Sequence, residues 1–209
     1  MIHELAQRAR ILGLPYRPTI PQELRRILSA ADEASRLLEP SEVSNLCSYS
    51  GVEVTPLLKL NAAAGKLVSL ARRQLLKQEP SLVETGGALY PEQRAEACWR
   101  DCFHFLRVSL YGVAVAEPDL TDNHGMQALA ELYTVLAVPV HALLIALTEL
   151  HNVTTVFYQR YAPARDVFLL DRSLTLLREN ISIVCGRSVS TEPYLEPNTL
   201  KEGNNSGVV

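Results

Sequence analysis

The stretch from Tyr90 to Gly112 constrains this chain more than any other, because Pro91 stands near its start and no proline or glycine follows until Gly112. Proline is favoured in the first turn of a helix, where its missing N–H costs nothing, and Glu92 suits the positive N-terminal end of the helix dipole. The pattern therefore predicts one helix from Glu92 to about Ala116, roughly 25 residues or about 38 Å long.

One face of this helix carries a cation, a thiol, a carboxylate and an aromatic ring. At about 100° per residue, these four side chains fall within one arc of about 100°: Arg94, Cys98, Asp101 and Phe105. A thiol, a carboxylate and a guanidinium on one face suit an extended, acidic cofactor. The thiol would form a bond to it, the carboxylate would accept from its N–H groups, and the arginine would pair with its acid groups. Taken alone, Cys98 is more often a small buried apolar residue and Asp101 an ordinary surface carboxylate.

The same residues resemble the chromophore helix of the phycobiliproteins, especially the allophycocyanin and phycocyanin subunits. The resemblance rests on these stretches, in chain order: Gly86-Gly87-x-x-Tyr90, Cys98-x-Arg100-Asp101, Leu106-Arg107, and Glu131-x-Tyr133 followed by Pro139. The short Cys-x-Arg-Asp pattern alone has little specificity, but the whole set is specific. The resemblance implies an all-α, globin-like domain.

The resemblance also implies a cofactor and its contacts. A linear tetrapyrrole similar to phycocyanobilin would be attached to Cys98 by a thioether, with Asp101 bonded to its pyrrole nitrogens and Arg94 paired with a propionate. Arg100 lies about 200° from Cys98 on the helix, so only the resemblance gives it a propionate contact; a surface salt bridge is the alternative. Tyr133 would pack against the pigment, although a core tyrosine fits the sequence nearly as well.

Composition excludes several other classes. The chain has 209 residues, a formal charge of −3 and a pI near 6.0, which does not suit a protein that binds nucleic acid through a basic surface. The longest apolar run, Val135–Leu147, is too short to span a bilayer and contains Pro139. The N-terminus has no apolar core of the signal-peptide kind, so we expect a cytoplasmic protein. Four cysteines in such a chain predict neither a disulfide framework nor a metal site.

Helical stripes and prolines predict the organisation along the chain. Helices are expected over about 23–38, after Pro56, over 92–116, 122–137 and 139–161, and after Pro163, with no strand. We expect three parts: an N-terminal extension over 1–37 with a proline-rich linker before its helix, a globin-like domain over 38–184, and a polar, flexible tail over 185–209.

Two functions follow. The first is a bilin-binding subunit in phycobilisome light harvesting or energy transfer, not an enzyme, located in the cytoplasm at or near the thylakoid surface. Its partners would be other phycobiliprotein-like subunits or phycobilisome linkers, in a homo- or hetero-oligomer. The second is an unpigmented protein of the same fold that acts in phycobilisome assembly, turnover or regulation. The N-terminal extension, and the segment over 38–49 that resembles a shortened form of the family's subunit-clasping region, motivate the second. Ala88 and His104 also depart from the family pattern.

Overall fold

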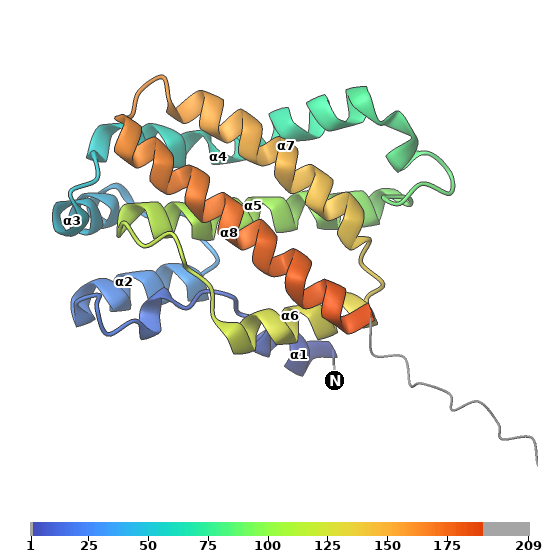
Figure 1. Ribbon diagram of the computed structural model, residues 1–209, viewed down its shortest axis with the longest axis horizontal. Helices are drawn as coiled ribbons and strands as arrows, with labels where there is room; N and C mark the ends of the chain where they lie inside the picture. Colours follow the sequence, from blue (N-terminus) through green and yellow to red (C-terminus); the bar gives the residue numbers. More distant parts are fainter. Residues whose placement is uncertain (1, 190–209) are drawn as a thin grey trace, which may run out of the picture.

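The computed structural model describes residues 2–189, and their side chains as far as residue 186, as a bundle of helices without a β-strand in that range (Figure 1). The α-helices are α1 (Ile2–Arg8), α2 (Gln22–Glu33), α3 (Pro40–Ser50), α4 (Val54–Gln78), α5 (Glu92–Ala114), α6 (Asn123–Val135), α7 (Val140–Tyr158) and α8 (Ala164–Val189). Two 3₁₀ helices, η1 (Leu14–Tyr16) and η2 (Pro80–Val83), lie between them. The predicted all-α class is confirmed.

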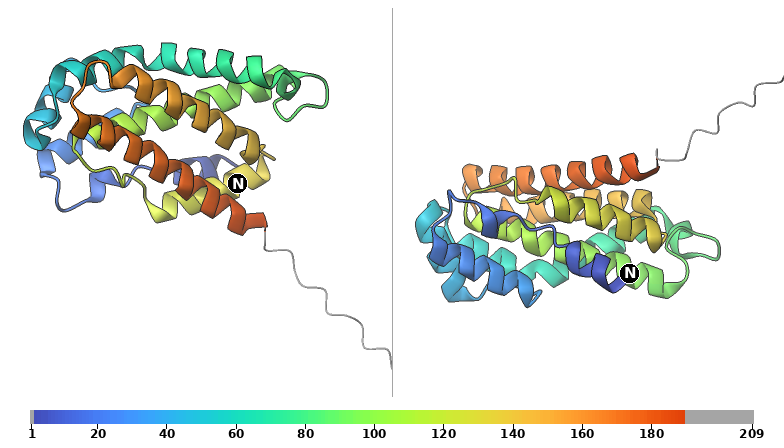
Figure 2. Two further views of the ribbon diagram at one scale, coloured as in Figure 1. Left: turned by 45° about the horizontal axis from the view of Figure 1, so that its top comes forward. Right: turned by 90° about the horizontal axis from the view of Figure 1, so that it is seen from below.

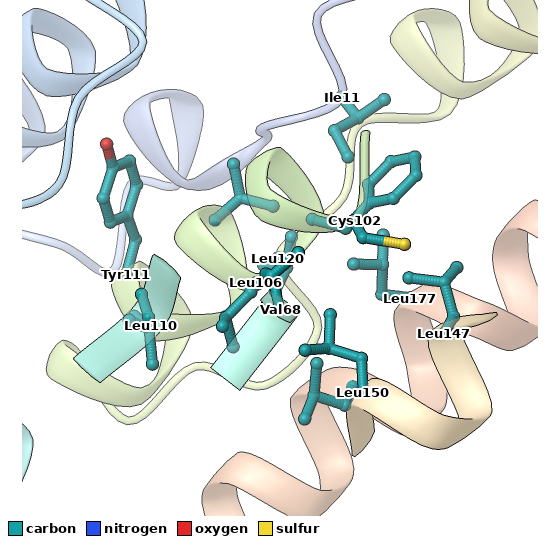
Figure 3. Close-up of a cluster of buried hydrophobic side chains, with 14 of the residues drawn as sticks. Ile11, Val68, Cys102, Leu106, Leu110, Tyr111, Leu120, Leu147, Leu150 and Leu177 are labelled. Carbon is teal, nitrogen blue, oxygen red and sulfur yellow. The ribbon is translucent and has the colours of Figure 1, made fainter. Parts of the chain in front are cut away.

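Helix α5 is the centre of the molecule, with α4, α7 and α8 packed around it (Figure 1). All of its residues from Phe105 to Ala114 are buried, and Leu106 and Leu110 join Leu150 of α7 and Leu177 of α8 in one hydrophobic core (Figure 3). The absence of glycine and proline before Gly112 allows this helix to run unbroken through the core. The first half of α5, before Phe105, continues the same helix, so its surface side chains have fixed positions.

The N-terminal residues run alongside α5, next to α6 (Figure 2, right). Helix α1 lies against α6. The extended residues after it form an isolated antiparallel bridge between Leu12 and Thr121. The amide of Gly13 donates to the carbonyl of Leu120, and the amide of Asp122 donates to the carbonyl of Ile11, both at 2.7 Å. The first residues of the chain are thus bonded to the connection between α5 and α6.

Some helix boundaries differ from the sequence prediction. Helix α2 ends at Glu33 and not near residue 38, because Ser35 takes a positive φ of 51° that breaks the helical path. Helix α6 begins at Asn123, where Asp122 is the cap and accepts a 2.7 Å hydrogen bond from the amide of Gly125. Helix α8 continues to Val189, past the expected boundary at residue 184. The rest of the predicted tail lies outside the described residues.

By length and composition alone, α7 could cross a membrane. It packs against α4 and α8, and its inner positions, such as Leu143, Ala146 and Leu150, are buried in the core. Apolar core helices of water-soluble proteins often have the same composition. The division of the chain into an extension, a domain and a tail stays a prediction.

Candidate functional site

A groove of about 580 Å³ lies between α5, α6, the C-terminal end of α2 and the N-terminal residues. This volume falls within the range of about 300–1,000 Å³ that is common for ligand and cofactor sites. Helix α5 contributes one wall through Ala97, Arg100, Asp101, His104, Phe105 and Arg107, among others. Helix α6 and the residues just after it contribute a second, mainly apolar wall that includes Leu129, Leu132, Tyr133 and Leu136. Charged and polar side chains, including Asp32 and Glu33 at the end of α2, complete the lining, so the cleft offers polar contacts as well as apolar surface.

A carboxylate and a phenol meet in this groove. The Tyr133 hydroxyl donates a 2.8 Å hydrogen bond to Asp101 Oδ2. Burial raises the pKa of Asp101, and the bond from Tyr133 and the charge of Arg100 oppose that rise. Burial also raises the pKa of Tyr133, and the neighbouring Asp101 adds to it, so the phenol stays protonated and remains a donor. Asp101 has lone pairs free for further donors, such as the N–H groups of a ligand.

Cationic and neutral nitrogen groups line the same wall. Arg100 is exposed at the groove. Arg107 is only 5% exposed and is bonded to Asp32 of α2 at 2.9 Å and to the hydroxyl of Tyr111 at 2.8 Å. Burial lowers the pKa of His104, and the charges of Arg107 and Arg100 lower it further, which favours a neutral ring. Its Nδ1 is buried and has no hydrogen-bond partner among the described residues.

Cys98 lies beside the groove and not among its lining residues. Its exposed fraction is 8%. At about 100° per residue, it falls about 20° past Phe105, at the edge of the groove-facing arc and on the side that leads to Cys102. The Cys102 thiol is sealed in the core beside Leu147 and Leu177 (Figure 3). The Cys102 thiol donates a hydrogen bond to the Cys98 sulfur, and this bond and burial raise the pKa of Cys102.

The structure thus brings three of the five predicted site residues together, namely Arg100, Asp101 and Tyr133. Cys98 adjoins them, whereas Arg94 is exposed and does not line the groove. Arg94 is one turn nearer the start of α5, beyond the end of the groove wall. The spacing of about 100° per residue gives the direction in which Arg94 points around the helix. It gives no information on where along the helix the groove ends.

Sequence reasoning missed His104 as a lining residue, although it follows Asp101 by three positions and so shares its face. It also missed Arg10 and Ile11, which reach the groove from the N-terminal segment. No periodic signal connects those residues to α5. Among residues 2–186, no group of three or more histidine, cysteine or acidic side chains is arranged to hold a metal ion.

Comparison with known proteins identifies the family. The family model described as "Phycobilisome protein" matches residues 26–168, which include all of α5 and α6. The phycobiliprotein beta chain of Mastigocladus laminosus is 32% identical over 112 residues, which cover 52% of this chain and 66% of that protein. The allophycocyanin alpha chain of Galdieria sulphuraria is 30% identical over 128 residues, 59% of this chain and 78% of that one. The C-phycocyanin beta chain of Aglaothamnion neglectum is 25% identical over 128 residues, 60% and 74% of the two chains.

These matches confirm the resemblance that the motifs indicated, and with it the globin-like, all-α fold. The match to the family model covers the α5 and α6 walls of the groove and leaves residues 2–25, including the N-terminal wall, outside it. The chain is a divergent member of the phycobilisome protein family.

Proposed function

We propose that this phycobilisome protein carries a linear tetrapyrrole in the groove between α5 and α6, attached by a thioether to Cys98. The observation that carries the proposal is the pairing of Asp101 with Tyr133 inside a cofactor-sized groove, beside a cysteine, in a chain of this family. Its role would be to absorb light and to pass excitation to neighbouring subunits.

Each site residue has a proposed task. The Asp101 carboxylate accepts from the pyrrole N–H groups, and charge-assisted bonds of this kind contribute about 1.5–3 kcal/mol each. Tyr133 keeps that carboxylate in place and packs its ring against the pigment. Arg100 pairs with an acid group within the groove, and the exposed Arg94 pairs with one that extends beyond its end. Together these contacts hold a flexible pigment extended, so that less of the absorbed energy is lost through rotation.

The attachment requires no oxidant and has no leaving group. The Cys98 sulfur adds to one carbon of a carbon–carbon double bond at the edge of the pigment, and the proton of the thiol ends on the other carbon. Because the sulfur lies at the edge of the groove-facing arc, a rotation of its side chain towards Phe105 would bring it to the ligand. The protein has no catalysed reaction in this proposal.

The proposed setting follows from the family. The chain would act in the cytoplasm, at or near the thylakoid surface, within or beside a phycobilisome. Its partners would be other phycobiliprotein-like subunits or linkers, in a homo- or hetero-oligomer. Copurification of the tagged protein with phycobilisomes from its native cells tests this setting, and its absence from every phycobilisome fraction would contradict it.

The test of the pigment is expression with a supply of phycocyanobilin, followed by denaturing electrophoresis and zinc-enhanced fluorescence. We expect a fluorescent band for the native chain and for Cys102→Ala, and none for Cys98→Ala. Cys102→Ala is the matched control because it removes the neighbouring thiol on the same helix. A dark band for the native chain, beside a bright phycocyanin subunit, would refute covalent attachment.

One observation favours a second function. Cys98 is almost fully buried and does not line the groove, so the chain could serve as an unpigmented partner of phycobilisome proteins in assembly, turnover or regulation. In that case Cys98→Ala would recover as many phycobilisome subunits in a pull-down as the native chain does. Loss of those partners together with the pigment would favour the pigmented role.

A further inference from the structure

The N-terminal segment, residues 2–13, forms the third wall of the groove. It contributes Ala6, Gln7, Ala9, Arg10 and Ile11 to the lining. The family match begins only at residue 26, so the family pattern does not account for this wall. A groove that the matched helices would leave open is thus closed by the chain's own first residues.

The wall has a fixed position. Its two backbone hydrogen bonds to the connection between α5 and α6 are both 2.7 Å long. Gly125, at the start of α6, lets the two backbones approach closely, because a Cβ atom there would lie 1.9 Å from the carbonyl oxygen of Arg10. The side chains of Leu5, Ile11 and Leu12 are buried. The backbone on either side of Arg10 is therefore anchored beside the groove, and the Arg10 side chain itself is exposed.

Arg10 differs from the other arginines of the groove in its electrostatic partners. Arg107 is already neutralised by Asp32 at 2.9 Å, and Arg100 adds to the field around Asp101. Arg10 makes no ion pair with any residue from 2 to 186. Its guanidinium is thus available for a carboxylate that enters the groove from outside the protein.

We propose that residues 2–13 are a built-in wall of the ligand site and that Arg10 binds a carboxylate of the tetrapyrrole, on the side of the groove opposite Arg100 and Asp101. This inference rests on the proposed function and adds a contact to it. A dicarboxylic pigment is then held from two sides, by α5 and by the N-terminal segment, without a second protein chain.

The test is reversible binding of biliverdin, a linear tetrapyrrole with two propionates, to the full chain carrying Cys98→Ser. Trp99 is the only tryptophan and lies on α5, so quenching of its fluorescence reports binding. We expect Arg10→Ala to weaken the affinity about tenfold, the loss of one charge-assisted contact. Arg8→Ala is the matched control: Arg8 is an exposed arginine of the same segment that does not line the groove, and its replacement should leave the affinity within about twofold.

Two further measurements separate a specific contact from a loss of structure. Biliverdin dimethyl ester has no free carboxylates, so the difference between Arg10→Ala and Arg8→Ala should disappear with it. Hydrogen exchange of the peptide 2–13 should slow when biliverdin binds, while exchange in α4 should not change. Equal affinities of the two variants for biliverdin, or unchanged exchange in peptide 2–13, would overturn the inference. If the Cys98→Ser chain with Arg8 and Arg10 unchanged binds neither biliverdin nor its dimethyl ester, the proposed function is refuted instead.

Discussion

The hydroxyl of Tyr133 donates a 2.8 Å hydrogen bond to Asp101 Oδ2 and so ties α6 to α5 within the wall of the groove. The bond uses only one of the two carboxylate oxygens of Asp101, and burial raises the pKa of this group. The site therefore keeps a partly desolvated negative charge, and this has consequences for stability as well as for binding.

Asp101→Asn should stabilise the chain without pigment and remove pigment binding. Because the folded-state pKa of Asp101 is raised above its usual 3.8, the folded protein binds more protons than the unfolded chain between the two values. Stability therefore falls as pH rises through that window and stays lower above it. We expect Asp101→Asn to gain up to about 1 kcal/mol at pH 7 and to flatten this dependence. Urea unfolding from pH 3 to pH 8 measures both effects. Glu96→Gln, on the exposed side of α5, is the control and should change little; a destabilised Asp101→Asn would contradict the assignment.

Arg107→Met should destabilise the fold far more than a comparable change at the surface. Arg107 and Asp32 are 6% and 15% exposed, so loss of one partner leaves a buried charge unpaired, at a cost of about 3–5 kcal/mol. Arg72 makes a 2.7 Å pair with Glu96, but both groups are well exposed, and Arg72→Met should cost less than about 1 kcal/mol. Chemical denaturation compares the two variants. Equal losses would mean that the Arg107–Asp32 pair does not hold α2 against α5.

Cys98 should react first among the four cysteines when the folded protein meets an alkylating reagent at pH 8. Burial raises the pKa of the Cys47 thiol to about 11 and also raises that of Cys185, and Cys102 is held by its bond to Cys98. The thiolate is the reactive form, so these three should react slowly until the chain unfolds. Iodoacetamide labelling followed by peptide mass spectrometry gives the order. If Cys98 were the last to react, attachment of a pigment to the folded chain would be untenable.

Gly125→Ala should release the N-terminal wall. Its new Cβ atom would overlap the carbonyl oxygen of Arg10 at 1.9 Å, so the backbone of one segment must move, and we expect a loss of about 2 kcal/mol or more. Gly65→Ala in the middle of α4 meets no atom within 4 Å and should instead stabilise by up to about 1 kcal/mol. Thermal unfolding and hydrogen exchange of peptide 2–13 measure the pair. Unchanged exchange in Gly125→Ala would show that the close approach is not required.

The helical bundle could be predicted from the sequence because its long helices have clear apolar stripes bounded by proline and glycine. The run from Glu92 onward predicted α5 to within two residues of its end at Ala114. The end of α2 could not be predicted, because the positive φ of Ser35 depends on tertiary contacts: the guanidinium of the following Arg36 binds Glu42 of α3 at 2.6 Å and 2.7 Å.

The candidate site was predicted only in part, and for a physical reason. Spacing on one helix gives the relative directions of Cys98, Asp101 and Phe105, but not which neighbouring element faces each direction. Asp101 and Phe105 face the groove, whereas Cys98 lies where the groove meets the core. Arg10 could not be found at all, because its place depends on a backbone bridge to Thr121, far away in the sequence.

That bridge has a consequence for the order in which the protein is made. Leu12 leaves the ribosome well before Thr121 is synthesised, so the first residues wait for their partner while most of the helices emerge. During translation the cleft on α5 lacks both its N-terminal wall and its α6 wall, and it is finished only when α6 has followed the connection out of the ribosome. The N-terminal wall and the α6 wall therefore form late and together, although the residues of the first are made at the very start of the chain.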